Sequence, residues 1–195
     1  MIRRIAILEP KGERLHVFSR SELPRLGGVL LATILRDRGY EARAYFLSRR
    51  ELLALELERE ADLIAISSIT PTAPVAYALA DHFRSRGKIV VMGGPHVTFL
   101  PEEALGHADY CILGEGEIPF PRLVEALNGR EPLEGVPGLA WMRDGRLATN
   151  PAPDPVADLD SLPFPDFSLL ETGGRRLGGP IGRVIVPIQT SRGCP

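Results

Sequence analysis

The sequence is poor in cysteine, since only Cys111 and Cys194 occur among 195 residues. Two cysteines do not make the disulfide framework of a small secreted domain, so we expect a reducing, cytoplasmic location. No apolar run approaches the roughly 20 residues of a spanning helix, and the apolar run before Glu9 is too short for a signal peptide. The formal net charge is only −2, and neither sign is concentrated in one stretch. We therefore expect neither nucleic acid nor a membrane as a partner.

Several binding motifs are also absent. The first apolar run, Ile2–Leu8, is not followed by G-x-G-x-x-G, which argues against a nicotinamide or flavin dinucleotide domain. The sequence has no Walker lysine motif. Glu9 alone does not supply the acidic cluster that a response regulator needs.

Short apolar runs alternate with segments of helical spacing, which predicts βαβ units and a parallel sheet. The expected strands lie at 2–8, 41–46, 62–67, 88–92 and 109–113, and the expected helices at 26–38, 48–59, 73–86, from about 101, and up to about 128. Ser48 and Glu51 form a capping box for the second of these helices. The pattern predicts a flavodoxin-like, doubly wound α/β fold with five parallel strands in the order 2-1-3-4-5.

The pattern changes after Gly138. Apolar residues on both sides of Asp144-Gly145 predict a β-hairpin, and the proline-rich stretch 151–165 predicts an extended linker. Arg183–Gln189 is a further strand-like run. We therefore expect a ligand-binding domain over 1–135, a hairpin and linker over 136–182, and the start of a second domain over 183–195.

Four loops follow strands and open toward the carboxyl edge of the predicted sheet, where doubly wound folds bind ligands. They are Glu9–Gly28, Ser67–Pro74, Gly93–Thr98 and Gly114–Glu117. Their glycines let the backbone approach a bulky ligand, and the second loop offers hydroxyl groups. Each glycine or hydroxyl taken singly is equally well explained as a turn or cap residue. Together they indicate a site for something large, flat and rich in amides.

The chain resembles the cobalamin-binding domain of cobalamin-dependent radical S-adenosylmethionine (SAM) proteins. The ordered segments that carry the resemblance are Leu23–Gly28, Ser67–Thr70, Gly93–Thr98 with Pro101–Glu103, Gly114–Glu117, and Leu162–Asp166, which resembles that family's inter-domain linker.

The resemblance implies that cobalamin (vitamin B12) lies on the carboxyl edge of the sheet. Its nucleotide tail would enter a groove between the 67–70 and 93–98 loops, its corrin would lie over 23–28, and 114–116 would close the side. The implied cofactor-binding residues are Leu26, Gly27, Gly28, Ser67, Ser68, Thr70, Gly93, Gly94, Pro95, His96, Gly114, Glu115 and Gly116.

The sequence departs from the wider cobalamin-binding fold in one respect. It lacks that fold's motif D-x-H-x-x-G, whose histidine replaces the lower ligand of cobalt. His16 lies in the corresponding loop, but Arg14 and Ser19 occupy the places of the Asp and Gly. We therefore interpret His16 as a solvated loop residue, and His96 as a groove or capping residue rather than a cobalt ligand. Glu115 and Glu117 are open to two interpretations, as catalytic carboxylates or as groups that cap the next helix or bond corrin amides.

Ser191–Pro195 resembles the opening of the radical SAM motif C-x-x-x-C-x-x-C, in which Cys194 would be the first ligand of a 4Fe-4S cluster. One thiolate cannot hold the cluster. We therefore expect the chain as given to bind cobalamin without turnover and to lack its partner, a C-terminal radical SAM barrel. In the intact relatives the expected chemistry is methyl transfer or cyclisation.

Two other functions remain open from the sequence. The first is a non-catalytic, flavodoxin-like binding or interaction module that has lost its ligand. The second is a flavin-binding domain.

Overall fold

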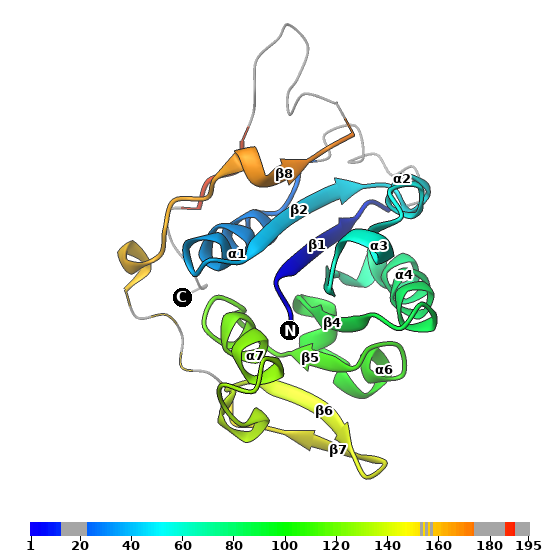
Figure 1. The fold of residues 1–195 in the computed structure, drawn as a ribbon, viewed down its shortest axis with the longest axis vertical. Coiled ribbons are helices and arrows are strands. Elements are labelled where there is room, and N and C mark those ends of the chain that lie inside the picture. Colours follow the sequence, from blue (N-terminus) through cyan, green and yellow to red (C-terminus); the bar gives the residue numbers. More distant parts are fainter. Residues whose placement is uncertain (13–22, 153, 155, 157, 174–185, 190–195) are drawn as a thin grey trace, which may run out of the picture.

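The computed structural model describes residues 1–12, 23–152, 154, 156, 158–173 and 186–189. One sheet forms its framework, with the strand order β7-β6-β5-β4-β3-β1-β2-β8 (Figure 1). The strands are β1 (Arg4–Pro10), β2 (Glu41–Leu47), β3 (Leu63–Ser67), β4 (Ile89–Gly93), β5 (Tyr110–Ile112), β6 (Leu139–Arg143), β7 (Arg146–Thr149) and β8 (Leu170–Glu171). The helices are α1 (Leu26–Asp37), α2 (Arg49–Ala54), α3 (Leu57–Glu60), α4 (Ala73–Ser85), α5 (Pro95–Phe99), α6 (Pro101–Leu105) and α7 (Pro119–Leu127).

The predicted order 2-1-3-4-5 is confirmed, and every neighbouring pair within it is parallel. The central strand β1 is buried from Ile5 to Pro10, which explains why it is apolar without alternation. Ser67 of β3 pairs with Gly93 of β4, so the loops that follow these two strands begin side by side. The register thus brings two of the predicted site segments together.

The sheet is larger than the sequence indicates. The predicted hairpin forms around Asp144 (φ 51°) and Gly145 (φ 75°), and its first strand pairs antiparallel with β5. The chain then returns to the opposite edge, where β8 pairs parallel with β2. The hairpin and part of the linker region therefore extend the sheet at both edges.

Another expectation fails in the C-terminal segment. The strand predicted over Arg183–Gln189 is absent from Val186–Gln189, the part of it that the structure describes. No strand pairing holds this segment, and the side chain of Ile188 is 80% exposed. Without a neighbouring strand its backbone groups have no ladder to join.

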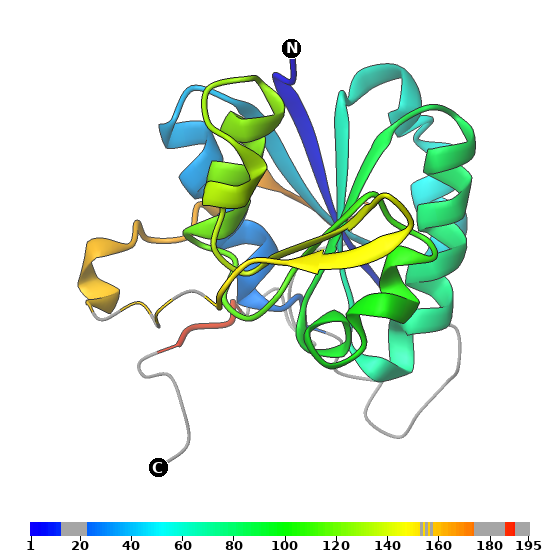
Figure 2. The ribbon, with the colours of Figure 1, turned by 90° about the horizontal axis from the view of Figure 1, so that it is seen from below.

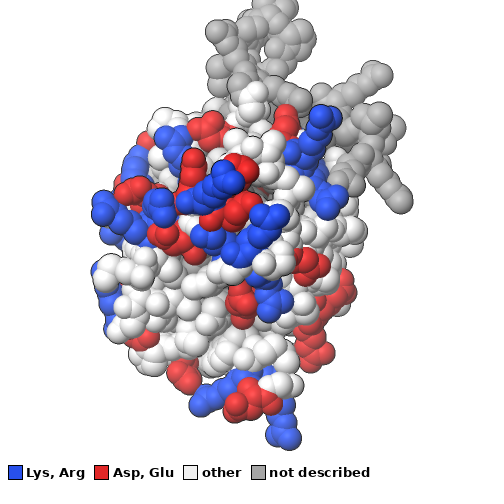
Figure 3. Space-filling view, turned by 45° about the vertical axis from the view of Figure 1, so that its right-hand side comes forward, with Lys and Arg blue, Asp and Glu red and all other residues white. Residues whose placement is uncertain are grey.

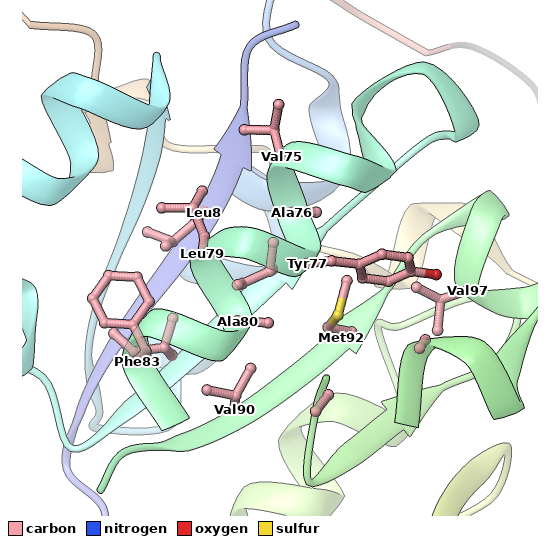
Figure 4. Close-up of a cluster of buried hydrophobic side chains, with 14 of the residues drawn as sticks. Leu8, Val75, Ala76, Tyr77, Leu79, Ala80, Phe83, Val90, Met92 and Val97 are labelled. Atoms are coloured by element: carbon pink, nitrogen blue, oxygen red, sulfur yellow. The ribbon is translucent and has the colours of Figure 1, made fainter. Parts of the chain in front are cut away.

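Helices cover both faces of the sheet (Figure 2). One face packs against α1 and α7 through residues such as Leu35 and Leu123. The other packs against α2 to α6, and Figure 4 shows the part of this core around α4, where Leu79 and Phe83 meet Leu8 of β1. The face of α4 that the sequence predicts to be apolar is fully buried.

The helix predicted over 48–59 is wrong in its length. The capping box of Ser48 and Glu51 forms, but the helix ends at Ala54, and α3 starts after Glu56, whose φ is 48°. Leu52 and Leu57 are both buried, yet residues five apart point about 140° away from each other on one helix. The break lets both leucines reach the core. The predicted elements also do not include α5, which directly follows β4.

On the face shown in Figure 3, basic and acidic side chains are interspersed. Within the described ranges, no helix is long and apolar enough to cross a bilayer.

Candidate functional site

A cavity of about 310 Å³ opens at the carboxyl edge of the sheet. Its floor is formed by the ends of the parallel strands, including Ile7, Ile66, Met92 and Ile112. Helix α1 and Phe120 of α7 form its walls. The cavity therefore lies at the switch point of the strand order, between β1 and the strands on its β3 side.

Ten of the predicted site residues line this cavity. They are Leu26, Gly27, Gly28, Ser67, Gly93, Gly94, Pro95, Gly114, Glu115 and Gly116. They come from the beginning of α1 and from the loops after β3, β4 and β5. Segments that are far apart in the sequence thus meet at one site, as parallel strands require.

Three predicted site residues do not line the cavity. Ser68 is fully buried, and its Oγ has no hydrogen-bond partner among the described residues. His96 is also buried: its Nε2 lies 2.9 Å from the hydroxyl of Tyr77, and its Nδ1 lies 3.2 Å from Oγ1 of Thr70. His96 and Thr70 therefore join the loops after β3 and β4 on the α4 side of the sheet.

Gly94 allows the loops after β3 and β4 to pack closely. Its φ of 96° and ψ of 175° belong to a region that is open essentially only to glycine. A Cβ at this position would lie 2.6 Å from the carbonyl oxygen of Ser68 and 3.1 Å from Oγ of Ser67. Gly114, with φ 77°, likewise needs the freedom of glycine, but a Cβ there would meet no atom within 4 Å.

The apolar floor and one charged pair at the cavity were not among the predicted site residues. The floor could have been read from the apolar residues at or near the end of each predicted strand. The charged pair joins Glu9, at the end of β1, to Arg25, just before α1, with Oε1 of Glu9 2.8 Å from Nε of Arg25. Glu9 is 7% exposed, and this burial raises the pKa of its carboxyl group despite the neighbouring guanidinium.

Arg25 is held at three points. Its backbone N–H and its Nε both donate to the carboxylate of Glu9, and its Nη2 donates to the carbonyl oxygen of Ser67 at 3.1 Å. The pair thereby ties the start of α1 to the ends of β1 and β3.

Glu115 connects the cavity to the chain beyond the hairpin. Its Oε2 accepts a hydrogen bond from the backbone N–H of Val156 at 3.0 Å. Farther along, the N–H of Asp166 donates to Oγ1 of Thr33 in α1, and the Asp166 carboxylate pairs with Arg36. The segment predicted as a linker is thus attached to the wall of the cavity at several points.

Two predicted residues, His16 and Cys194, lie outside the described residues. Cys111 lies in β5 and is fully buried as predicted, and burial raises the pKa of its thiol to about 12. No group of three or more His, Cys, Asp or Glu side chains that could hold a metal occurs within the described ranges.

The fold and the cavity define a doubly wound domain that binds a large, partly apolar ligand at the carboxyl edge of its sheet. The sequence profile of the B12 binding domain matches residues 18–124. The chain belongs to this family and is a cobalamin-binding module, as the sequence predicts.

Two curated relatives and one solved structure are similar to this chain. An uncharacterized methyltransferase of Pyrococcus horikoshii is 31% identical over 88% of this chain and 39% of its own length. The bacteriochlorophyllide d C-8(2)-methyltransferase of Chlorobaculum tepidum is 34% identical over 69% of this chain and 26% of its own length. The radical S-adenosylmethionine methyltransferase TsrM of Kitasatospora setae, solved with cobalamin and a [4Fe-4S] cluster, has a TM-score of 0.63 at 19% identity, over 84% of this chain and 31% of that one. The chain thus spans less than half the length of each of these proteins. At its low identity, the likeness to TsrM shows only that the two chains share a fold.

The residues at the cavity fit the nucleotide tail of cobalamin. This tail ends in dimethylbenzimidazole, a flat and uncharged double ring, and the cavity floor offers apolar side chains such as Ile7, Ile66 and Ile112. Gly27 and Gly28 leave the beginning of α1 without side chains at the mouth. A Cβ at Gly27 would meet no atom within 4 Å, so the space there is open to a ligand.

Proposed function

We propose that this chain is the cobalamin-holding domain of a radical SAM enzyme that transfers methyl groups or forms a ring. The observation that carries this proposal is the glycine-edged apolar cavity at the switch point, in a chain of the B12-binding family. Curated relatives named methyltransferases and magnesium-protoporphyrin IX monomethyl ester cyclases support the reaction class. The segment Leu162–Asp166 and Cys194 support the link to a radical SAM domain.

In this proposal different predicted residues would contact different parts of the cofactor. The nucleotide tail would fill the cavity between the loops that begin at Ser67 and Gly93, the corrin would lie over Leu23–Gly28, and Gly114–Gly116 would close the side. Bound cobalamin supplies a cobalt centre that can carry a methyl group or electrons. The protein would position this centre and exclude water from the tail.

The described part of the linker follows the wall of the cavity. Because Val156 bonds Glu115 and Asp166 bonds Thr33, the chain leaves the cavity along a defined path over α1. We propose that a barrel beginning near residue 183 faces the carboxyl edge and reads the substrate, with the first domain ending near 135. Cys194 would begin its cluster motif.

Retention of hydroxocobalamin tests the first part of the proposal. After incubation and desalting, the corrin absorbance should stay with the protein, and its absence at micromolar concentrations would refute cofactor binding. Gly27→Leu places a branched side chain in the open cavity mouth and should lower retention. Ala54→Leu adds the same side chain to an exposed position of α2, and should leave retention unchanged. Retention of flavin instead of corrin would favour the flavin-binding alternative.

The gene tests the second part. Two cysteines that follow Cys194 at the spacing C-x-x-x-C-x-x-C would support the radical SAM assignment. Coding sequence beyond Pro195 without them would contradict it. For a longer product with all three cysteines, we expect a 4Fe-4S signal in electron paramagnetic resonance after anaerobic reconstitution and reduction. We propose a cytoplasmic location, which the low cysteine content and the oxygen-sensitive cluster of the proposed whole enzyme support.

A further inference from the structure

Arg25 is the one cationic residue among the described residues that line the cavity. Its guanidinium is already oriented, because Nε donates to Glu9 and Nη2 donates to the carbonyl oxygen of Ser67. A side chain held at both ends of its planar group loses little freedom when it binds a further partner. Arg25 was not among the residues predicted to bind the cofactor.

One nitrogen of this guanidinium is unused. Nη1 is shielded from solvent and has no hydrogen-bond partner among the described residues. A buried donor without a partner is costly, and a charged donor especially so. Arg25 lines the cavity and its side chain is 32% exposed, so a small shift of the guanidinium that brings Nη1 to an acceptor on a ligand there would remove this cost.

The charge of the donor selects the acceptor. The corrin carries neutral amides and the benzimidazole is neutral, whereas the phosphodiester of the nucleotide tail is an anion. A neutral amide can also accept a hydrogen bond from the guanidinium, but only the phosphodiester adds the attraction between opposite charges. The phosphodiester joins the corrin side chain to the ribose of the tail, so it passes the mouth of any cavity that holds the base. Arg25 lies there, between the start of α1 and the end of β3.

We propose that Arg25 binds the phosphodiester of cobalamin through its guanidinium, so that the domain discriminates corrinoids with a phosphate from those without one. Glu9 acts as a positioning residue, since its carboxylate fixes both the backbone and the Nε of Arg25. The inference rests on the proposed function, in which the cavity holds the nucleotide tail.

Three corrinoids separate the contributions of the phosphate and of the base to binding. They are hydroxocobalamin, which has both, cobinamide phosphate, which keeps a phosphate but lacks the base, and cobinamide, which lacks both. Spectroscopic titration gives the Kd of each for the wild-type chain, for Arg25→Leu and for the control Arg59→Leu, which removes an exposed arginine of α3. Arg25→Leu should weaken binding of the two phosphate-bearing corrinoids by about tenfold to a hundredfold, the range for a hydrogen bond to a charged group. It should leave the Kd of cobinamide within about twofold, and Arg59→Leu should change none of the three.

Equal weakening of all three corrinoids by Arg25→Leu would overturn the inference, because it would show only a structural role of the pair. Unchanged binding of the phosphate-bearing corrinoids would overturn it as well. If Arg25→Leu fails to fold because Glu9 is left buried and charged, the double variant Glu9→Gln/Arg25→Leu provides the same comparison. Failure of the wild-type chain to bind any of the three would refute the proposed function itself, whereas corrinoid binding that ignores Arg25 refutes this inference alone.

Discussion

Replacement of Gly94 by alanine tests whether the close packing of the β3 and β4 loops matters. The Cβ would lie 2.6 Å from the carbonyl oxygen of Ser68, and neither atom belongs to a flexible side chain that can move away. The backbone conformation adds strain of about 1–3 kcal/mol for a residue with a side chain. Overpacking of a tight site costs about the same again, about 1–3 kcal/mol.

Gly145→Ala is the matched control. Gly145 also has a positive φ, of 75°, but a Cβ there would meet no atom within 4 Å. Its replacement should cost only the left-handed conformation, about 1–2 kcal/mol. Gly94→Ala should therefore lower the free energy of unfolding by about 2–6 kcal/mol, a large part of the roughly 5–15 kcal/mol that stabilises a typical domain.

Urea denaturation followed by circular dichroism gives both free energies, and desalting with hydroxocobalamin gives the effect on binding. Gly94→Ala should also lower cobalamin retention, because the loop after β3 must shift where it lines the cavity. If Gly94→Ala is no less stable than Gly145→Ala and retains cobalamin equally well, the close approach to Ser68 has no energetic role and the reasoning is wrong.

Three further changes address the core, the linker and the buried carboxylate. Phe83→Ala should lower the free energy of unfolding by about 3–5 kcal/mol in urea denaturation, since this residue is fully buried. The control Phe99→Ala should lower it by almost nothing, because Phe99 is 82% exposed. Similar losses for the two variants would contradict the packing described for α4. Thr33→Val removes the acceptor for the Asp166 N–H, so hydrogen exchange of that amide should become faster and the free energy of unfolding should fall by about 1 kcal/mol. An unchanged exchange rate would show that this contact does not hold the linker. Glu9 has a raised pKa in the folded state, so it binds its proton more tightly there, and its contribution to stability falls as the pH rises from about 4.5 through the folded pKa. Glu9→Gln should therefore flatten the pH dependence of the free energy of unfolding over this range, and an unchanged slope would show that another group titrates.

Much of the fold follows from short-range patterns in the sequence. The apolar run Ile5–Leu8 predicts a strand buried on both faces, and the box of Ser48 and Glu51 fixes where α2 starts. Asp144-Gly145 gives the hairpin because both residues adopt positive φ in a two-residue turn. Helical spacing alone predicts one helix from Ser48, whereas the structure has two helices there, α2 and α3. The left-handed residue Glu56 lets two leucines face the core, and no local signal marks it.

The site was predictable to the extent that the strand order brings loops together. Gly28, Ser67, Gly93 and Gly116 meet at one cavity because parallel strands end at the same edge. The inward turn of His96 toward Tyr77 was not predictable, since it depends on how α4 and the short helix α5 pack.

The sequence by itself determined the alternation of strands and helices, the positions of the glycines and the family to which the chain belongs. These follow from local conformational preferences and from the order of motifs along the chain. Only the tertiary structure decided that the hairpin and β8 extend the sheet, and that Glu9 fixes Arg25 beside the apolar cavity. The physical reason is that hydrogen bonding across strands and the burial of charge depend on neighbours that are distant in the sequence, and only folding brings these neighbours together.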